Sequence, residues 1–304
     1  MRLVSYGPSG KERCGVLLGE RILDLNRASQ GLFREPLSWD MVQFLSLEGW
    51  FEAAQRVVEA SVSLGEEAWV KVSETRLGPP VPRPSKIIAL GINYREHGEE
   101  IQQNVELPSS PILFSKASSS VTGPYDDVIY PPETQALDYE VELAVVIGRR
   151  AKRIRPEEAD QYIAGYMVLN DVSARDIQLG GDRKLGQQWF RGKSFDTFAP
   201  MGPHLVTREE VGDPHGLLIR LTLNGEVRQD SLTSRLLFKV PEILSFISHG
   251  ITLLPGDVIS TGTPSGVGIF SDPPRLLQVG DEMVAEVERI GFLKNRIVAE
   301  QANR

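Results

Sequence analysis

One segment, residues 137–148, constrains the fold more than any other, because acidic and apolar residues alternate in it before a wholly apolar run. Its sequence is LDYEVELAVVIG. Successive side chains of a strand point to opposite faces, so Asp138, Glu140 and Glu142 share one face. The apolar end must be covered on both faces, which places these carboxylates at the edge of a core. Protons, basic partners or a cation must offset their repulsion there.

A second acid follows another apolar run. Asp171 comes directly after residues 165–170, GYMVLN, which predict a buried strand. Three carboxylates without a nearby histidine or cysteine favour a hard cation, Mg²⁺, Mn²⁺ or Ca²⁺, over Zn²⁺. The same alternation is also typical of the solvated face of an edge strand. We therefore expect either a metal site at Glu140, Glu142 and Asp171 or a polar sheet edge.

The rest of the chain predicts a β-rich α+β fold in two parts. Residues 79–84, PPVPRP, contain four prolines, which favour an extended linker. We place a boundary there, between a small N-terminal α/β module (1–76) and a main domain (77–304). Strand-like runs recur through the main domain, which predicts a β-sandwich roll and not a doubly wound sheet. Helical segments are fewer and comprise 156–162, 173–179 and 240–249.

Charge and hydropathy narrow the range of partners. The formal net charge of −8 argues against nucleic acid and anionic membranes, because both require a basic face. No apolar run approaches the roughly 20 residues of a membrane span. Cys14 is the single cysteine, so no internal disulfide forms, which is typical of a reducing compartment. We expect a cytoplasmic protein with neither nucleic-acid nor membrane partners.

Several motifs occur in an order that resembles the fumarylacetoacetate hydrolase family. The first is Glu140-x-Glu142, with Asp171 following the second Glu by 29 residues. The others are GINY at 91–94 followed by His97 and Glu100, NDVSARD at 170–176, GKSFD at 192–196 and TGTPSGVG at 261–268. Each is weak alone, but together they cover roughly residues 85–298 and are specific.

The resemblance implies a β-sandwich roll, usually a homodimer, and a small 2-oxo acid as substrate. It also implies a divalent metal on Glu140, Glu142 and Asp171, with Mg²⁺ or Mn²⁺ favoured and Ca²⁺ an alternative. A 2-oxo acid chelates such an ion through its carboxylate and keto oxygens, and the ion then acts as a Lewis acid. Hydrolases, decarboxylases and isomerases use this chemistry, so the family defines the metal better than the reaction.

Two further segments carry candidate catalytic residues. His97 and Glu100 are three residues apart, so they share a face of a helical turn. The resemblance implies a dyad in which Glu100 orients His97 to take a proton from water; the alternative is an exposed histidine on a polar loop. Lys193 either stabilises an enolate oxygen from a partly buried position or is a solvated loop residue.

Candidate substrate ligands lie on the short helix after Asp171. Arg175 and Gln178 either bind the carboxylate and keto groups of the substrate or pair with acids such as Asp176 and Asp182.

A glycine-rich segment, residues 261–268, provides a second set of candidates. The backbone of Gly262 and the hydroxyl of Thr263 either bind a small anion or form a purely structural turn. Lys116 and Tyr139 are weaker candidates for the pocket.

These observations predict a divalent-metal-dependent hydrolase that cleaves a 2,4-diketo acid of the acylpyruvate type to pyruvate and a carboxylic acid. The closest alternative is a decarboxylase or isomerase of a 2-oxo diacid, with oxaloacetate or a hydroxymuconate-type compound as substrate. An alternative of another class is a non-catalytic, metal-stabilised binding protein.

Overall fold

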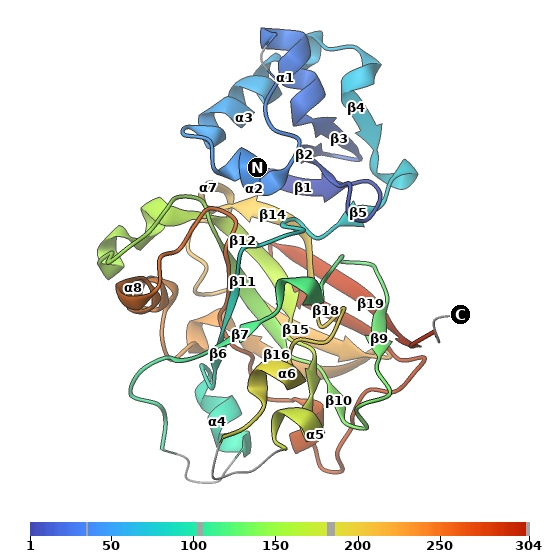
Figure 1. The fold of residues 1–304 in the computed structure, drawn as a ribbon, viewed down its shortest axis with the longest axis vertical. Coiled ribbons are helices and arrows are strands. Elements are labelled where there is room, and N and C mark those ends of the chain that lie inside the picture. The colour runs from blue at the N-terminus through green and yellow to red at the C-terminus, as the bar shows by residue number, and fades with distance from the viewer. Residues whose placement is uncertain (35, 102–105, 181–185, 302–304) are drawn as a thin grey trace.

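Strands provide most of the regular structure in the computed structural model, which describes residues 1–34, 36–101, 106–180 and 186–301 (Figure 1). The strands are β1 (Arg2–Tyr6), β2 (Arg13–Leu18), β3 (Arg21–Asp24), β4 (Trp69–Lys71), β5 (Leu77–Gly78), β6 (Ile87–Gly91), β7 (Ile112–Lys116), β8 (Val121–Thr122), β9 (Val128–Tyr130), β10 (Leu137–Asp138), β11 (Val141–Ile147), β12 (Ile163–Asn170), β13 (Ser173–Ala174), β14 (Ala199–Thr207), β15 (Leu218–Leu223), β16 (Glu226–Leu232), β17 (Val258–Ser260), β18 (Glu282–Val287) and β19 (Gly291–Ala299). The α-helices are α1 (Leu25–Phe33), α2 (Met41–Leu45), α3 (Trp50–Ala60), α4 (Arg95–Ile101), α5 (Arg175–Gln178), α6 (Trp189–Gly192), α7 (Arg208–Val211) and α8 (Val240–Gly250). The β-rich α+β class expected from the sequence is confirmed.

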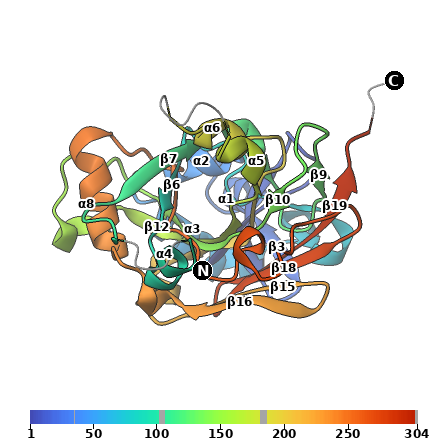
Figure 2. The same ribbon diagram turned by 90° about the horizontal axis from the view of Figure 1, so that it is seen from below.

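Two sheets enclose the main core. The larger one follows the order β4-β3-β2-β1-β14-β12-β11-β17-β6-β7, and the smaller one the order β16-β15-β18-β19-β9. Apolar side chains from β11 and β12 pack against those from β15, β18 and β19, and helix α8 joins the same core. Figure 2 views this sandwich along its length, with β15, β16 and β18 on one side and α8 at the flank.

β11 is a central strand and not an edge. It pairs with β12 on one side and β17 on the other, and all seven of its residues are buried. Val141 and Leu143 face the main core, whereas Ala144 and Val146 face a second core shared with the N-terminal strands. Glu142 has the same parity as Ala144, so burial on both faces excludes the solvated edge strand as an explanation for the acidic pattern.

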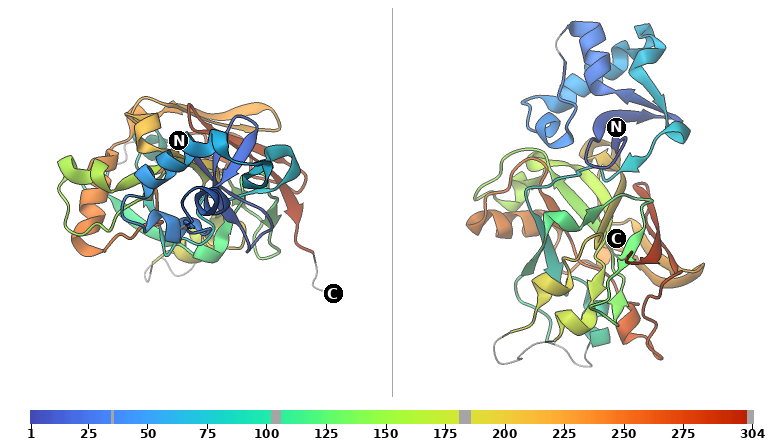
Figure 3. Two further views of the ribbon diagram at one scale, coloured as in Figure 1. Left: turned by 90° about the horizontal axis from the view of Figure 1, so that it is seen from above. Right: turned by 45° about the vertical axis from the view of Figure 1, so that its right-hand side comes forward.

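The N-terminal strands, which precede the proline-rich segment in the sequence, belong to the same large sheet as the strands that follow it. Leu3 of β1 pairs with Leu205 of β14, and β2, β3 and β4 continue outward from β1. Figure 3 shows these strands and helices α1 and α3 stacked on the end of the main sheet. The domain boundary expected between residues 76 and 77 stays a prediction. Strands from the two sides of this boundary are hydrogen-bonded to each other in one sheet.

Two helical predictions need correction. Residues 156–162 form a 3-10 helix. Residues 173–174 form strand β13, because Ala174 pairs with Leu137 of β10, so the helix starts only at Arg175. Among the described residues, no helix is both long and apolar enough to cross a membrane.

Candidate functional site: a buried carboxylate triad beside a cavity

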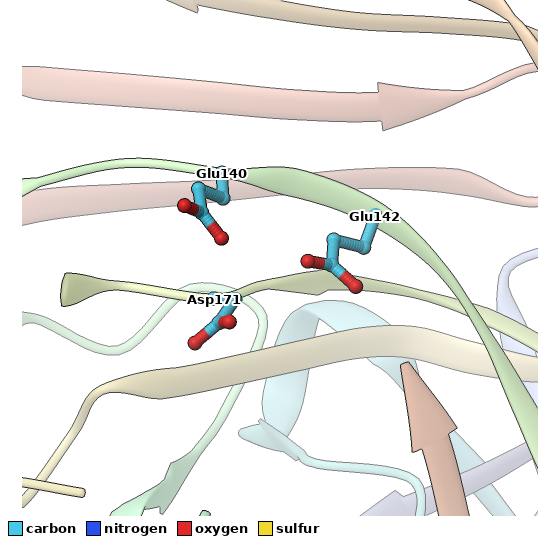
Figure 4. A group of neighbouring side chains, drawn as sticks. All are labelled: Glu140, Glu142 and Asp171. Atoms are coloured by element: carbon cyan, nitrogen blue, oxygen red, sulfur yellow. The ribbon is translucent and has the colours of Figure 1, made fainter. Parts of the chain in front are cut away.

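Three carboxylates meet at the point where β11 begins and β12 ends. One oxygen from each of Glu140, Glu142 and Asp171 lies within 4.8 Å of the other two. All three residues are buried, with exposed fractions of 5%, 1% and 0%. Figure 4 shows Glu140, directly before β11, and Glu142, on β11, reaching towards Asp171. The structure therefore brings together the three acids that the sequence predicts as metal ligands.

Strand register explains why these acids meet. Val141 pairs with Asn170 in the antiparallel β11–β12 ladder, and the backbone N–H of Asp171 donates to the carbonyl of Glu140 at 2.8 Å. Asp171 is therefore opposite Glu140, and the period of two places Glu142 on the same face as Glu140. The side-chain amide oxygen of Asn170 accepts a hydrogen bond from the Glu140 N–H at 2.9 Å, which holds the junction.

Two buried lysines enter the triad from other segments. The ammonium of Lys193, directly after α6, is 2.7 Å from Glu140 Oε2 and 2.7 Å from Asp171 Oδ2. Lys116, the last residue of β7, pairs with the other oxygen of Asp171 and donates to the carbonyl of Val172 at 3.2 Å. Both lysines are at most 2% exposed. The solvated-loop alternative for Lys193 is excluded.

The charges in this cluster do not balance. Burial acts to raise the pKa of Glu140, but the charges of Lys193, Arg175 and His97 outweigh it and hold the pKa well below its ordinary value. For Glu142, burial and then the charges of Asp171 and Glu140 raise the pKa to about 8. Glu142 is thus the carboxylate that the lysines leave without compensation.

One carboxylate oxygen of Glu142 is placed to bind a metal ion. Its Oε2 accepts hydrogen bonds from Ser260 Oγ at 2.5 Å and from the Gly262 N–H at 2.7 Å. Its Oε1 is buried and has no hydrogen-bond partner among the residues that the structure describes. Such an oxygen is costly unless a proton or cation meets it. The all-oxygen donor set of Glu140, Glu142 and Asp171 suits Mg²⁺, Mn²⁺ or Ca²⁺.

His97 and Glu100 form the pair that their spacing predicts. Both lie on α4, and His97 Nδ1 is 3.2 Å from Glu100 Oε2. The other oxygen of Glu100 accepts a hydrogen bond from the Gly266 N–H at 2.8 Å. His97 is only 6% exposed, so the interpretation as an exposed loop histidine is wrong. A carboxylate that accepts from Nδ1 leaves Nε2 as the basic nitrogen of the ring.

Arg175 is held by acids rather than facing open space. Its Nε donates to Asp138 Oδ2 at 2.9 Å, and its Nη2 is 2.6 Å from Glu140 Oε1. Its Nη1 donates to Gln178 Oε1 at 3.0 Å, which leaves the amide nitrogen of Gln178 for other contacts. The acid pairing expected as an alternative therefore occurs, but with Asp138 and Glu140.

The two acids named for that pairing do not hold Arg175. Asp176 instead binds the hydroxyl of Thr134 and the N–H of Gln135. Asp182 lies outside the described residues.

The glycine-rich segment binds a protein carboxylate. The N–H of Gly262 is used by Glu142, while Thr263 Oγ1 donates to the Val141 carbonyl at 2.9 Å and accepts from Gln229 Nε2 at 2.8 Å. Thr263 still lines the cavity beside the triad. The segment thus supports Glu142 first, and its role as a substrate ligand stays a prediction.

A cavity of about 240 Å³ borders these groups. Its polar side contains Glu140, His97, Arg175, Gln178, Lys193 and Thr263. Its apolar side is formed by Leu90, Ile92, Ile101, Phe114, Leu179, Trp189 and Phe270. Larger grooves of about 610 and 800 Å³ lie elsewhere, but neither is lined by any member of the triad. The small cavity is therefore the candidate active site.

Two residues of the site, Lys116 and Gln229, carried little or no signal in the sequence, and for Asp138 the pattern gave the position but not the partners. Lys116 ends an ordinary strand-like run and was only a weak candidate. Asp138 anchors Arg175 and also accepts the N–H groups of Gly268 and Ile269. Gln229, on β16, is fully buried and accepts the Val141 N–H at 2.9 Å. Tyr139, the other weak candidate, packs in the main core.

Fold and site together define a class: sheet-rich proteins with an acidic, oxygen-ligand centre beside a cavity of substrate size. Comparison with known proteins identifies the family. Residues 86–298 match the family model described as fumarylacetoacetate (FAA) hydrolase C-terminal. This chain belongs to the fumarylacetoacetate hydrolase family, as the motifs in the sequence indicated.

Similar proteins cover nearly the whole chain. Oxaloacetate tautomerase FAHD2A, mitochondrial, of Bos taurus is 46% identical over 280 residues, which are 92% of this chain and 85% of that protein. Oxaloacetate tautomerase Fahd2a, mitochondrial, of Rattus norvegicus is 43% identical over 303 residues, 98% and 92% of the two chains.

One of the similar solved structures contains a metal ion and a 2-oxo acid by its name. Maleylpyruvate hydrolase from Sphingobium sp. SYK-6, in complex with manganese(II) ion and pyruvate, is similar with a TM-score of 0.78 and 29% identity, covering 99% of this chain and 100% of that one. These comparisons support divalent-metal binding in the family and show that its members include enzymes.

The cytoplasmic location expected from the sequence is contradicted by these relatives. The proteins from Bos taurus, Rattus norvegicus and Homo sapiens are all mitochondrial by name. Net charge and cysteine number report on partners and redox conditions, and neither distinguishes one reducing compartment from another.

Proposed function

We propose that this chain is a divalent-metal-dependent tautomerase that moves a proton between carbon 3 and the enol oxygen of an oxaloacetate-type 2-oxo diacid. One observation carries the proposal: His97, which is buried and bonded to Glu100, lines the same cavity as Glu140 of the buried carboxylate triad. A tautomerase needs a base for carbon and a positive environment for oxygen, and this cavity provides both. The names of relatives that are 43–46% identical support the same reaction.

Mg²⁺ or Mn²⁺ is the proposed cofactor, held by Glu140, Glu142 and Asp171, and when bound it supplies Lewis acidity towards the 2-oxo acid group. The chain itself contributes the remaining charges. Lys193 presents an ammonium at the cavity wall, where it favours negative charge on the substrate oxygen. Arg175, Gln178 and Thr263 line the cavity and are the proposed groups that orient the carboxylate end of the substrate. The N–H of Gly262 is already bonded to Glu142, so Gly262 acts through the position of that ligand.

His97 is the proposed proton carrier. Glu100 is held by the Gly266 N–H and accepts from His97 Nδ1, so the ring is fixed with Nε2 free to exchange a proton with carbon 3. Glu100 also stabilises the imidazolium that forms when carbon 3 is deprotonated. The apolar wall of the cavity limits water, which favours return of the proton to the substrate over loss to solvent.

Hydrolysis of a 2,4-diketo acid, the reaction first expected from the sequence, is the second candidate. The similar maleylpyruvate hydrolase, whose structure contains manganese and pyruvate, supports it. In that reaction the same His97–Glu100 pair takes its proton from water. Tautomerisation ranks first because the most similar of the relatives compared carry that activity in their names.

Product analysis separates the candidates. The purified chain, loaded with Mg²⁺ or Mn²⁺, is mixed with the enol form of oxaloacetate, and enol loss, keto product, CO₂ and pyruvate are followed together. We expect faster enol loss without CO₂ release, and loss of this rate in His97→Ala and after chelation. CO₂ with pyruvate indicates a decarboxylase, and release of acid and pyruvate from acylpyruvates indicates the hydrolase. No turnover of any of these compounds leaves a metal-stabilised binding protein and ends the proposal.

The expected homodimer, like the expectation of small-molecule partners alone, stays a prediction. Light scattering of the purified chain tests the first of these.

A further inference from the structure

Ile92 has an unusual backbone conformation at the cavity wall. It directly follows β6 and has a φ of 50°, in the left-handed region that β-branched residues rarely adopt. It is half-buried and lines the cavity that also contains His97 and Lys193. A glycine would adopt this conformation without strain, so the isoleucine side chain costs free energy here. Such strain persists only where the neighbouring residues fix the backbone.

The residue after Ile92 is fixed by three hydrogen bonds. Asn93 Nδ2 donates to the Thr261 carbonyl at 2.8 Å and to the Phe238 carbonyl at 3.2 Å, and Asn93 Oδ1 accepts the Phe238 N–H at 2.8 Å. Gly262 packs on the same side chain: a β-carbon added there would lie 2.8 Å from Asn93 Cβ. The turn after β6 is therefore clamped to the loop that supports Glu142.

The residue before Ile92 is equally confined. A β-carbon at Gly91 would lie 2.9 Å from the ring of Trp189, so the chain passes this wall of the cavity in close contact. Trp189 in turn packs edge-on against Phe114, with ring centroids 5.2 Å apart. Both neighbours of Ile92 are thus closely packed, which opposes a backbone shift that would withdraw its side chain from the cavity wall.

We propose that Ile92 is a specificity-determining residue whose side chain limits the length of 2-oxo acid that the cavity accepts. The inference rests on the proposed function, since it assumes that 2-oxo acids bind here. The cavity, at about 240 Å³, is below the range of about 300–1,000 Å³ that is usual for ligand sites. A rigidly held branched side chain at its wall therefore selects short substrates, with four carbons preferred over longer diacids and over acylpyruvates with extended tails.

The test compares Ile92→Gly with Arg153→Gly. Arg153 also has a positive φ, 53°, but it is exposed and does not line this cavity, so it controls for strain relief alone. Binding of oxalate, oxaloacetate, 2-oxoglutarate and 2-oxoadipate to the Mn²⁺-loaded proteins is measured by calorimetry, which needs no turnover. Ile92→Gly should improve binding of the longest acid relative to oxalate by about ten-fold or more, the usual effect of a methylene in a tight pocket. Arg153→Gly should leave the ratio unchanged.

A larger side chain at residue 92 gives a second test, which remains informative if the glycine variant does not fold. Ile92→Trp should bind oxalate as before and lose 2-oxoglutarate and 2-oxoadipate. An unchanged ratio across the series in both Ile92 variants would show that the residue is only structural. Equal loss of all acids in Ile92→Gly would assign the role to the backbone, which also overturns the proposal. If the wild-type protein binds these acids but does not tautomerise oxaloacetate, the proposed function is refuted and the proposal for Ile92 is not affected. If the wild-type protein binds none of the acids, the proposed function and the proposal for Ile92 are both refuted.

Discussion

Two buried carboxylates in this chain have the same chemistry and opposite surroundings. Asp24, at the start of α1, is fully buried and accepts hydrogen bonds from Tyr6, from the Arg13 guanidinium and from the Arg27 N–H. Burial acts to raise its pKa, but the Arg13 and Arg27 hydrogen bonds outweigh burial and lower the pKa. Glu142 is as deeply buried, yet other carboxylates are its neighbours and its pKa is raised to about 8.

The difference teaches how to distinguish a structural acid from a functional one. Asp24 forms a complete hydrogen-bond network. Both of its carboxylate oxygens have partners, and these bonds connect the N-terminus of a helix to a neighbouring strand. Glu142 forms an incomplete network: its Oε1 has no hydrogen-bond partner among the described residues, and the neighbouring carboxylates disfavour its negative charge. Burial by itself is therefore weak evidence for a site, whereas burial with an unpaired oxygen and uncompensated charge is strong evidence.

The largest effect is expected for Glu142→Gln. Turnover should fall below detection, and affinity for Mn²⁺ should fall by more than about 100-fold, because loss of a mere supporting residue already costs about 10–100-fold. Folding stability without metal should hold or rise, since the variant removes the excess charge. Metal titration by calorimetry and an oxaloacetate assay measure both. Full turnover in this variant would remove Glu142 from the site.

Lys116→Met should have the next largest effect. It leaves Asp171 with one ammonium in place of two, and removing one partner of a buried pair costs about 3–5 kcal/mol of unfolding free energy. Urea unfolding in the presence of a chelator measures this, and Mn²⁺ should restore part of it by replacing the lost positive charge. Lys71→Met, which breaks the exposed pair with Glu74, is the control and should change nothing measurable. Equal stability of the two variants would contradict this account of the cluster.

Asp24→Asn should affect stability without affecting the site. The substitution breaks the ion pair between Asp24 and Arg13, whose side chain is 30% exposed. The expected loss of unfolding free energy is therefore about 2 kcal/mol, less than for Lys116→Met. Metal affinity and turnover should match those of the wild-type protein at a temperature where both are folded. A large drop in metal affinity would mean that the two networks are coupled through the sheet.

A further prediction concerns pH. The folded-state pKa of Glu142, about 8, lies above its ordinary value of 4.5, so its contribution to stability is complete below about pH 4.5 and is lost as pH rises through about 8. Asp24, whose pKa is lowered, contributes above its ordinary value of 3.8 and loses that contribution as pH falls.

Thermal unfolding with chelator, from about pH 5 to about pH 9, tests this difference. The melting temperature of the metal-free protein should decline across the range, and Glu142→Gln should flatten the decline. Stabilisation by Mn²⁺ should grow with pH, because the ion displaces a proton. A wild-type profile with no decline would refute the raised pKa.

Local patterns predicted the core of the site well. The alternation over residues 137–148 correctly placed Glu140 and Glu142 on one face, and the apolar run before Asp171 correctly indicated a buried strand end. The three-residue spacing of His97 and Glu100 was enough to predict their contact. Each of these depends on geometry within one strand or one helical turn, where sequence separation translates directly into direction.

Contacts between distant segments were not predictable in this way. Lys116 is 55 residues from Asp171 along the chain, and Arg175 is 37 from Asp138. Gly262, expected to meet a substrate, meets Glu142 at a separation of 120 residues. The periodicity of side chains within one strand or helix does not predict such contacts, because the packing of β7, β10 and β17 around β11 determines them.

The sequence by itself determined that Glu140 and Glu142 share one face of a strand and that Asp171 follows an apolar run in a β-rich chain, since side-chain alternation and hydropathy are local properties. Only the tertiary structure decided how those acids are compensated. Two lysines and an arginine, brought in from separate elements, satisfy Glu140 and Asp171 and leave one oxygen of Glu142 without a partner among the described residues. Electrostatic balance depends on distance in space, and that distance is set by how the sheets pack.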